Sequence, residues 1–151
     1  MASLENVPMI QHRAAMSPTF SKDDLLGKLG YTKALLRRLK REESDTRKPW
    51  VRFIAERANR TLSAPMYPKF ENGSVLLVDR HYSSLVRCRK DEPNLYMLRK
   101  GEKLLVRWIE SQGNQLCLRP ENRELSPGLD RHRQEVSAYL LHCWPSGSHR
   151  Y

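Results

Sequence analysis

The sequence predicts an α+β protein in which a small N-terminal helix-turn-helix precedes a compact, mostly antiparallel β domain. Residues 21–41 repeat leucines at helical spacing between helix-capping residues. From Tyr67 onward, short runs rich in β-branched and aromatic residues alternate with Gly, Pro, Asn and Asp. The predicted parts are a loosely ordered arm at 1–20, the helical segment at 21–58, the β domain at 59–144 and a disordered tail at 145–151.

Length and composition set the class of protein. The chain has 151 residues, of which 39% are hydrophobic and 29% charged, as in soluble globular proteins. No apolar run is long enough to span a bilayer and no secretory signal is visible, so we expect a cytoplasmic protein without a membrane partner. Lys and Arg number 27 against 17 Asp and Glu, a net charge of +10 that favours a polyanionic partner.

Cysteines and histidines give no sign of a metal or cofactor. Three cysteines and five histidines are scattered along the chain, without the paired spacing of a zinc site or a disulfide framework. The sequence therefore predicts buried or incidental thiols, no metal and no cofactor.

Two short helices are expected between residues 21 and 41. Ser21 is suited to cap the first, which ends at Gly30, and Thr32 is suited to cap the second. Leucines form one apolar face on each helix. Positive charge covers the rest of the second helix, at Lys33, Arg37, Arg38, Lys40 and Arg41.

Such a helix pair can dock on duplex DNA, with the second helix in the major groove. The candidates for base contacts are Thr32, Lys33 and Arg37, and those for phosphate contacts are Arg38, Lys40 and Arg41. Charge and spacing alone fit equally well a basic helical hairpin with a solvated charged face.

Residues 25–39 resemble the helix-turn-helix of lambda-repressor-like regulators. The similarity lies in an apolar Tyr31, the hydroxyl of Thr32, a glycine at Gly30 and later leucines. Leu26 stands where the family usually has a small alanine. The resemblance implies sequence-specific binding of duplex DNA.

Residues 49–58 are ambiguous between helix and strand. Phe53 and Ile54 would share one side of a helix that starts at Pro49. The alternation that begins with Val51 and Phe53 would instead make a strand. We favour the helix.

The β domain is expected to contain about five strands. Glycine-containing turns join the second strand to the third and the third to the fourth. The predicted strands are 75–78, 95–98, 103–109, 115–118 and 136–144.

The order of these features resembles the C-terminal domain of LexA, UmuD and the lambda-type phage repressors. Residues 65–79 follow that family's Ser-Met-x-Pro turn and the apolar strand that ends in Asp. Residues 105–109 match its Val-Lys-Arg strand, and residues 120–122 match its Asp/Glu-Asn segment. The resemblance implies a LexA-type β domain through which two chains pair as a homodimer.

The two catalytic positions of that family are changed. Its members cleave their own linker with a serine nucleophile and a neutral, buried lysine base. The matching residues here are Pro65, which has no hydroxyl, and Arg107, which keeps its proton. The resemblance implies an inactive dimerisation or sensing domain; the alternative is a shifted register in which Ser63 reacts with the help of Lys100 or Lys103.

The sequence thus predicts a repressor-like, DNA-binding transcriptional regulator that is not an enzyme. Its expected partners are duplex DNA and a second copy of the chain. Two alternatives remain: a self-cleaving serine–lysine protease that uses Ser63, and a protein-interaction module that does not bind DNA.

Overall fold

A computed structural model describes residues 3–15, 17, 19–39, 51–81, 95–100, 103–112, 115–121, 130–133 and 141–145. Its strands are β1 (Leu4–Ile10), β2 (Leu25–Thr32), β3 (Phe53–Arg57), β4 (Val75–Asp79), β5 (Leu95–Lys100), β6 (Lys103–Gln112), β7 (Gln115–Arg119), β8 (Asp130–Arg133) and β9 (Leu141–Pro145). Its helices are α1 (Lys33–Leu39) and α2 (Arg60–Ser63), with short 3-10 turns η1 (His12–Ala14), η2 (Lys22–Asp24) and η3 (Ala64–Met66).

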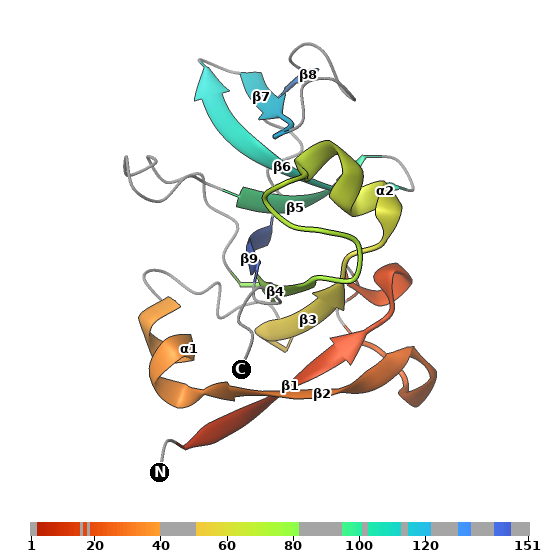
Figure 1. Cartoon of the computed structure of the whole chain (residues 1–151), viewed down its shortest axis with the longest axis vertical. Helices are drawn as coiled ribbons and strands as arrows, with labels where there is room; N and C mark the ends of the chain where they lie inside the picture. The colour runs from red at the N-terminus through yellow and green to blue at the C-terminus, as the bar shows by residue number, and fades with distance from the viewer. Residues whose placement is uncertain are drawn as a thin grey trace.

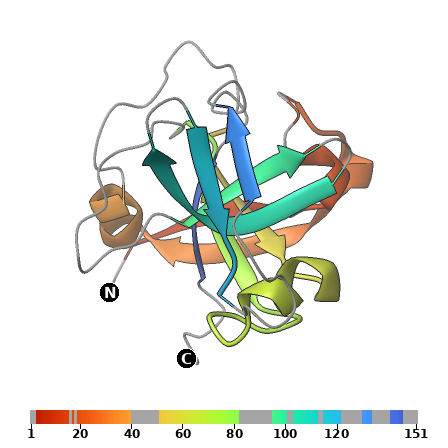
Figure 2. The ribbon, with the colours of Figure 1, turned by 90° about the horizontal axis from the view of Figure 1, so that it is seen from above.

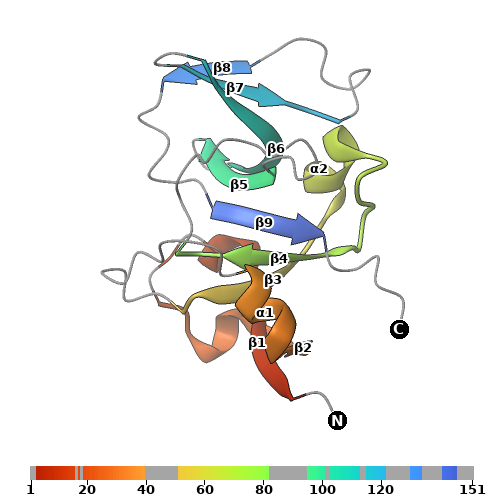
Figure 3. The ribbon, with the colours of Figure 1, turned by 90° about the vertical axis from the view of Figure 1, so that its left-hand side faces the viewer.

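The described strands form one hydrogen-bonded sheet in the order β2-β1-β3-β4-β9-β5-β6-β7-β8. Neighbouring strands are antiparallel except for β1 and β3, which are parallel. Figures 1 and 3 show β1 and β2 at one end of the molecule, β3, β4 and β9 in the middle, and β6 to β8 at the other end. Strands from both ends of the described chain therefore share one sheet.

The predicted helix-turn-helix is wrong, and the fold is mostly β. Residues 25–32 form β2, which pairs with β1 from Leu4 opposite Thr32 to Ile10 opposite Leu25. Along β2 the burial alternates, with Lys28 exposed and Tyr31 buried. This is a strand period, and pairing with β1 overrides the helical spacing of the leucines. Only the second predicted helix exists, as α1.

The segment expected as a loosely ordered arm contains a strand. β1 contributes Val7, Met9 and Ile10 to the core and lies between β2 and β3. Pro8 stands opposite Lys28 in the β1–β2 pairing. The N–H of Lys33 donates to the carbonyl of Ser3, and hydrogen-bonded and non-hydrogen-bonded residue pairs alternate along β1 and β2 from that point. Pro8 and Lys28 therefore form a non-hydrogen-bonded pair. The β1–β2 pairing therefore loses no hydrogen bond at Pro8, and the missing N–H falls on the side of β3, where the pairing comprises Met9 opposite Ala55.

The preferred helix over residues 49–58 is also wrong, because Phe53–Arg57 is β3. Phe53, Ile54, Ala55 and Glu56 are all buried, so both faces of the strand are covered. A strand covered on both faces loses its polar alternation, which is why its sequence could also be interpreted as a helix.

The strands predicted in the second half are confirmed where the structure describes them. β4, β5, β6 and β7 include the four predicted ranges. Both hairpins are confirmed as well, by pairing of Lys100 with Lys103 and of Gln112 with Gln115. The last predicted strand is seen only as β9, since 136–140 lie outside the described residues, and β8 was not predicted.

Thr32 caps α1 as predicted, whereas the helix that Ser21 was expected to cap is only a 3-10 turn. The hydroxyl of Thr32 accepts the backbone N–H of Leu35 at 3.2 Å at the start of α1. At Ser21, both the backbone N–H and the hydroxyl bond to a carboxylate oxygen of Asp24, at 3.1 and 3.3 Å. This second cap begins η2, a single 3-10 turn that leads into β2 rather than into a helix.

Two core clusters position the helices. Leu36 of α1 packs with Tyr31, Phe53 and residues of β1 on one side of the sheet. Leu62 and Met66, from α2 and η3, pack with Val106 of β6 in the larger cluster. Seen from above, α1 and α2 lie well apart on the periphery of the sheet (Figure 2).

Candidate functional site

Pro65 and Arg107, the residues that the LexA-type resemblance matches to a serine and a lysine, lie in η3 and β6. Arg107 is 9% exposed, and its Nη1 donates to the carbonyl of Val106 at 2.8 Å. Side chains alternate along β6, so Val106 packs toward Met66 while Arg107 points to the other side of the strand, where Ile109 is buried. Pro65, in η3, precedes Met66. Neither residue supplies a nucleophile or a base.

The alternative nucleophile, Ser63, is turned into the protein. It is 4% exposed, and its hydroxyl donates to the carbonyl of Arg60 at 3.5 Å. Lys100 and Lys103 face each other at the β5–β6 turn, where Lys103 is exposed. The serine–lysine scheme needs a buried lysine beside an accessible serine, and neither the buried Ser63 nor the exposed Lys103 meets these requirements.

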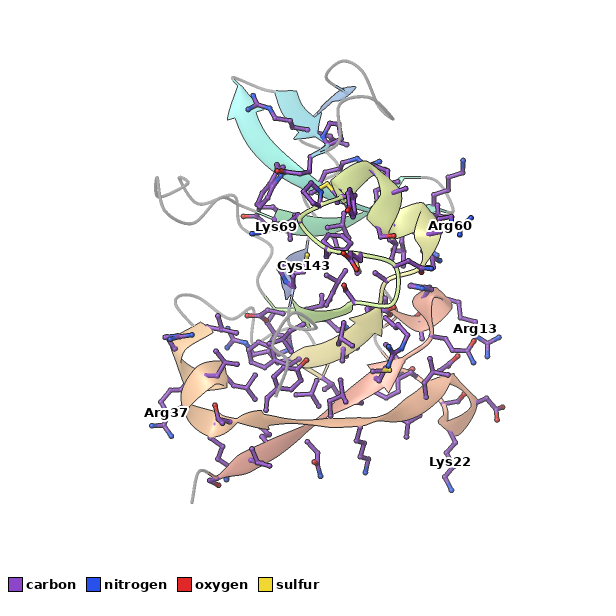
Figure 4. All side chains as sticks on the ribbon, in the orientation of Figure 1. Arg13, Lys22, Arg37, Arg60, Lys69 and Cys143 are labelled. Atoms are coloured by element: carbon purple, nitrogen blue, oxygen red, sulfur yellow. The ribbon has the colours of Figure 1, made fainter. Side chains whose placement is uncertain are left out.

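The predicted DNA contacts concentrate on α1. Lys33, Arg37 and Arg38 are exposed on one face of the helix, and Leu36 on the other is 1% exposed. Figure 4 shows Arg37 pointing away from the sheet. Thr32 is the helix cap, so its hydroxyl is already engaged within the chain. Lys40 and Arg41 lie outside the described residues.

A cleft of about 480 Å³ lies at the far end of the β1–β2 pair from α1. It was not foreseen from the sequence. Its walls come from the end of β1, η1, the start of β2, the end of β3, the start of α2 and the turn before β4. The lining residues are Ile10, Gln11, His12, Arg13, Leu26, Glu56, Arg57, Ala58, Asn59, Asn72 and Gly73.

A histidine and a buried carboxylate form the polar centre of this cleft. Nδ1 of His12 lies 2.8 Å from Oε2 of Glu56. The Glu56 side chain is 1% exposed, whereas that of His12 is 37% exposed. Arg80, itself fully buried, adds a favourable charge interaction with Glu56, and its Nη2 donates to the carbonyl of Ser17.

The geometry perturbs each of these groups. The close contact with the Glu56 carboxylate raises the pKa of His12, although burial works in the opposite direction. Burial raises the pKa of Glu56, against the opposing effects of His12 and Arg80. Burial lowers the pKa of Arg80 to about 10, with the charge of Glu56 opposing it. Groups of this kind in a cleft are characteristic of functional sites and also of structural ion networks.

Two arginines stand at the rim. Nε of Arg13 donates to Oδ1 of Asp24 at 2.8 Å, and Nη1 of Arg57 donates to the carbonyl of Gly73 at 2.9 Å. Hydrogen bonds from Ser21, followed by the interaction with Arg13, lower the pKa of Asp24. Both arginines line the cleft together with His12, and each of these contacts engages one N–H group of the guanidinium.

Sequence spacing could not have found this site. His12 and Glu56 come from distant segments that meet only because β1 and β3 are neighbours, with Met9 opposite Ala55. The one local signal is Glu56 itself, a charged residue that directly follows the apolar run from Phe53 to Ala55. A charge at an inward strand position indicates a partner without identifying it.

Comparison with known proteins does not assign this site. No protein-family model matches the sequence, and no curated protein matches it significantly. Within the described ranges, no group of three or more His, Cys, Asp or Glu side chains is placed to hold a metal ion. None of the helices seen there is long and apolar enough to cross a membrane.

Proposed function

We propose that this protein is a non-catalytic nucleic-acid-binding protein that contacts backbone phosphates through the exposed face of α1. The observation that carries the proposal is the set of Lys33, Arg37 and Arg38, all exposed on one helix face. In a chain with a net charge of +10, this face is a compact source of phosphate contacts.

The helix is held so that these side chains point outward. Leu35, Leu36 and Leu39 anchor α1 to the cluster that includes Tyr31 and Phe53. Among the residues described, no carboxylate forms an ion pair with Lys33, Arg37 or Arg38. Exposed cations of this kind replace the counterions of a nucleic-acid backbone, a contact that carries no sequence information.

The absence of catalysis is proposed from the residues at the changed positions. Pro65 and Arg107 stand where the LexA-type resemblance expects the nucleophile and the base. Ser63 is buried and bonded to the backbone of its own helix. We also propose, on the resemblance alone, that two chains pair, which would place two α1 faces on one duplex and raise the effective concentration of each.

The test is binding to random-sequence duplex DNA at several salt concentrations. Replacing Lys33, Arg37 and Arg38 together with alanine is expected to weaken binding and to lower the slope of log K against log salt by roughly 2 to 3. The matched control replaces Lys22, Arg60 and Lys103, which are exposed elsewhere and remove the same charge.

The two triple variants separate a site from a general charge effect. If both weaken binding equally, the net charge alone attracts the duplex and α1 is not the binding face. If the unaltered protein does not bind duplex DNA even at low salt, the proposed function is wrong.

A further inference from the structure

We propose that the cleft beside His12 binds a small organic carboxylate, with the carboxylate held by His12 and Arg57 and an apolar body lying against Ile10, Leu26 and Ala58. This inference is independent of α1. The cleft and the helix lie at opposite ends of the β1–β2 pair, as the positions of Arg13 and Arg37 show (Figure 4).

The first argument is the orientation of His12. Its Nδ1 lies 2.8 Å from Oε2 of the buried Glu56, so the ion pair directs that nitrogen inward. Nε2 is then the ring atom left to donate to a ligand. With 37% of its side chain exposed, His12 remains accessible from the cleft.

The second argument is the balance of charge around His12. Within the part of the chain that the structure describes, the charged groups around the cleft are Glu56 and Arg57 from β3, Arg13 from η1 with its partner Asp24 from η2, and Arg80 after β4. With His12 protonated, four cations face two carboxylates. The excess positive charge lies at the rim, whereas the Glu56 charge is buried beneath His12. An anionic head group at the mouth is therefore attracted.

The third argument is the composition of the walls. Ile10, Leu26 and Ala58 contribute apolar surface, and Leu26 is 57% exposed. A volume of about 480 Å³ lies within the range of small-molecule sites. Apolar walls with a few convergent polar groups suit a ligand with a charged head and an apolar body better than an inorganic anion.

The ligand should bind more tightly at lower pH. Glu56 raises the pKa of His12, so the imidazolium persists above the range of an ordinary histidine. As the pH rises through this raised value, His12 loses its proton and the attraction for a carboxylate falls. The arginines keep their charge, so binding weakens without being abolished.

The experiment follows the imidazole signals of His12 by NMR during titration with sodium hexanoate, with hexanamide as the uncharged control. We expect a saturable shift with hexanoate in the millimolar range and none with hexanamide. Equal shifts with both compounds would show an apolar pocket without carboxylate recognition. No shift with either would show that the cleft is not a ligand site. Either result overturns the proposal.

Variants identify the groups responsible. Arg57→Gln should weaken hexanoate binding by about tenfold, because a charge-assisted hydrogen bond is lost. The matched control Arg60→Gln removes a neighbouring exposed charge that does not line the cleft, and it should bind as the unaltered protein does. Equal losses in both variants would contradict a specific site.

The role of His12 has its own readout. In Glu56→Gln the imidazole loses its anionic partner, so hexanoate binding should fall at a lower pH than in the unaltered protein. An unchanged pH profile in folded Glu56→Gln would remove His12 from the site. If that variant does not fold, the comparison of Arg57→Gln with Arg60→Gln decides the proposal.

Discussion

Glu56 is the residue on which the interior of this sheet depends. Its carboxylate is buried in β3, and its charge interacts with His12 on one side and Arg80 on the other. Removing one member of a buried ion network costs more than the network contributes, because the remaining charge loses its compensation. A substitution that removes the Glu56 charge therefore leaves the buried charge of Arg80 without this compensation, and that determines its effect on stability.

Glu56→Ala is expected to lower the free energy of unfolding by about 3 kcal/mol, because Arg80 loses a nearby negative charge in the interior. Urea unfolding followed by circular dichroism measures this. Arg13→Ala removes only an exposed pairing with Asp24 and should cost much less. Comparable losses in the two variants would show that the buried charges do not form a coupled network.

The ion pair between His12 and Glu56 also predicts that stability depends on pH. Because Glu56 raises the pKa of His12 above 6.5, the His12 contribution is fully present below 6.5. It is lost as the pH rises through the raised value. The difference in unfolding free energy between the unaltered protein and His12→Gln should therefore shrink from acidic to alkaline pH. A difference that stays constant or grows would contradict an ion pair between His12 and Glu56.

At the scale of elements, two glycines differ in whether the backbone conformation requires a glycine. Gly73 has a φ of +91° in the turn that lines the cleft and leads into β4. A residue with a Cβ is strained in this conformation. Gly27 lies on β2, where an added Cβ would meet nothing within 4 Å. The turn therefore needs its glycine and the strand does not.

Gly73→Ala is expected to destabilise the protein by about 1 kcal/mol, because alanine disfavours a positive φ. Gly27→Ala should be neutral or slightly stabilising, because alanine restricts the unfolded chain and clashes with nothing here. Thermal unfolding of both variants under the same conditions measures the difference. A larger loss for Gly27→Ala would contradict the conformations assigned to the two residues.

Local patterns in the sequence predicted some elements and failed for others. The strands β4 to β7 were predictable, because alternation, turn residues and short hairpins are all local signals. The caps at Thr32 and Ser21 were predictable for the same reason. β2 and β3 were not, since their leucines and buried runs fit two periods and only pairing with β1 decides between them. The His12–Glu56 pair depends on that same pairing.

At the scale of the whole molecule, one core joins distant parts of the chain. Ile10 and Ala15 near the N-terminus pack in the same cluster as Val106 and Cys143. Burial raises the pKa of the Cys143 thiol, which keeps it protonated within this cluster. A chain with this arrangement is expected to unfold in a single transition.

A fragment that starts at residue 59 should therefore fail to fold cooperatively. It lacks β1, β2 and β3. It also lacks three residues of the largest core cluster, Ile10, Ala15 and Ile54. Circular dichroism and tryptophan fluorescence should show a sigmoidal, coincident transition for the full chain and a gradual change for the fragment. A cooperative transition in the fragment would show that the second half is an independent domain.

The position of β9 determines when the sheet can be completed during synthesis. Within the described residues, β2, β1, β3 and β4 form one hydrogen-bonded group and β5 to β8 form another, and β9 joins them by pairing with both β4 and β5. Residues 141–145 must therefore leave the ribosome before the two groups can be joined. Until then, β4 and β5 present open edges to other chains. The nascent protein passes through a stage at which it depends on rapid completion or on chaperones.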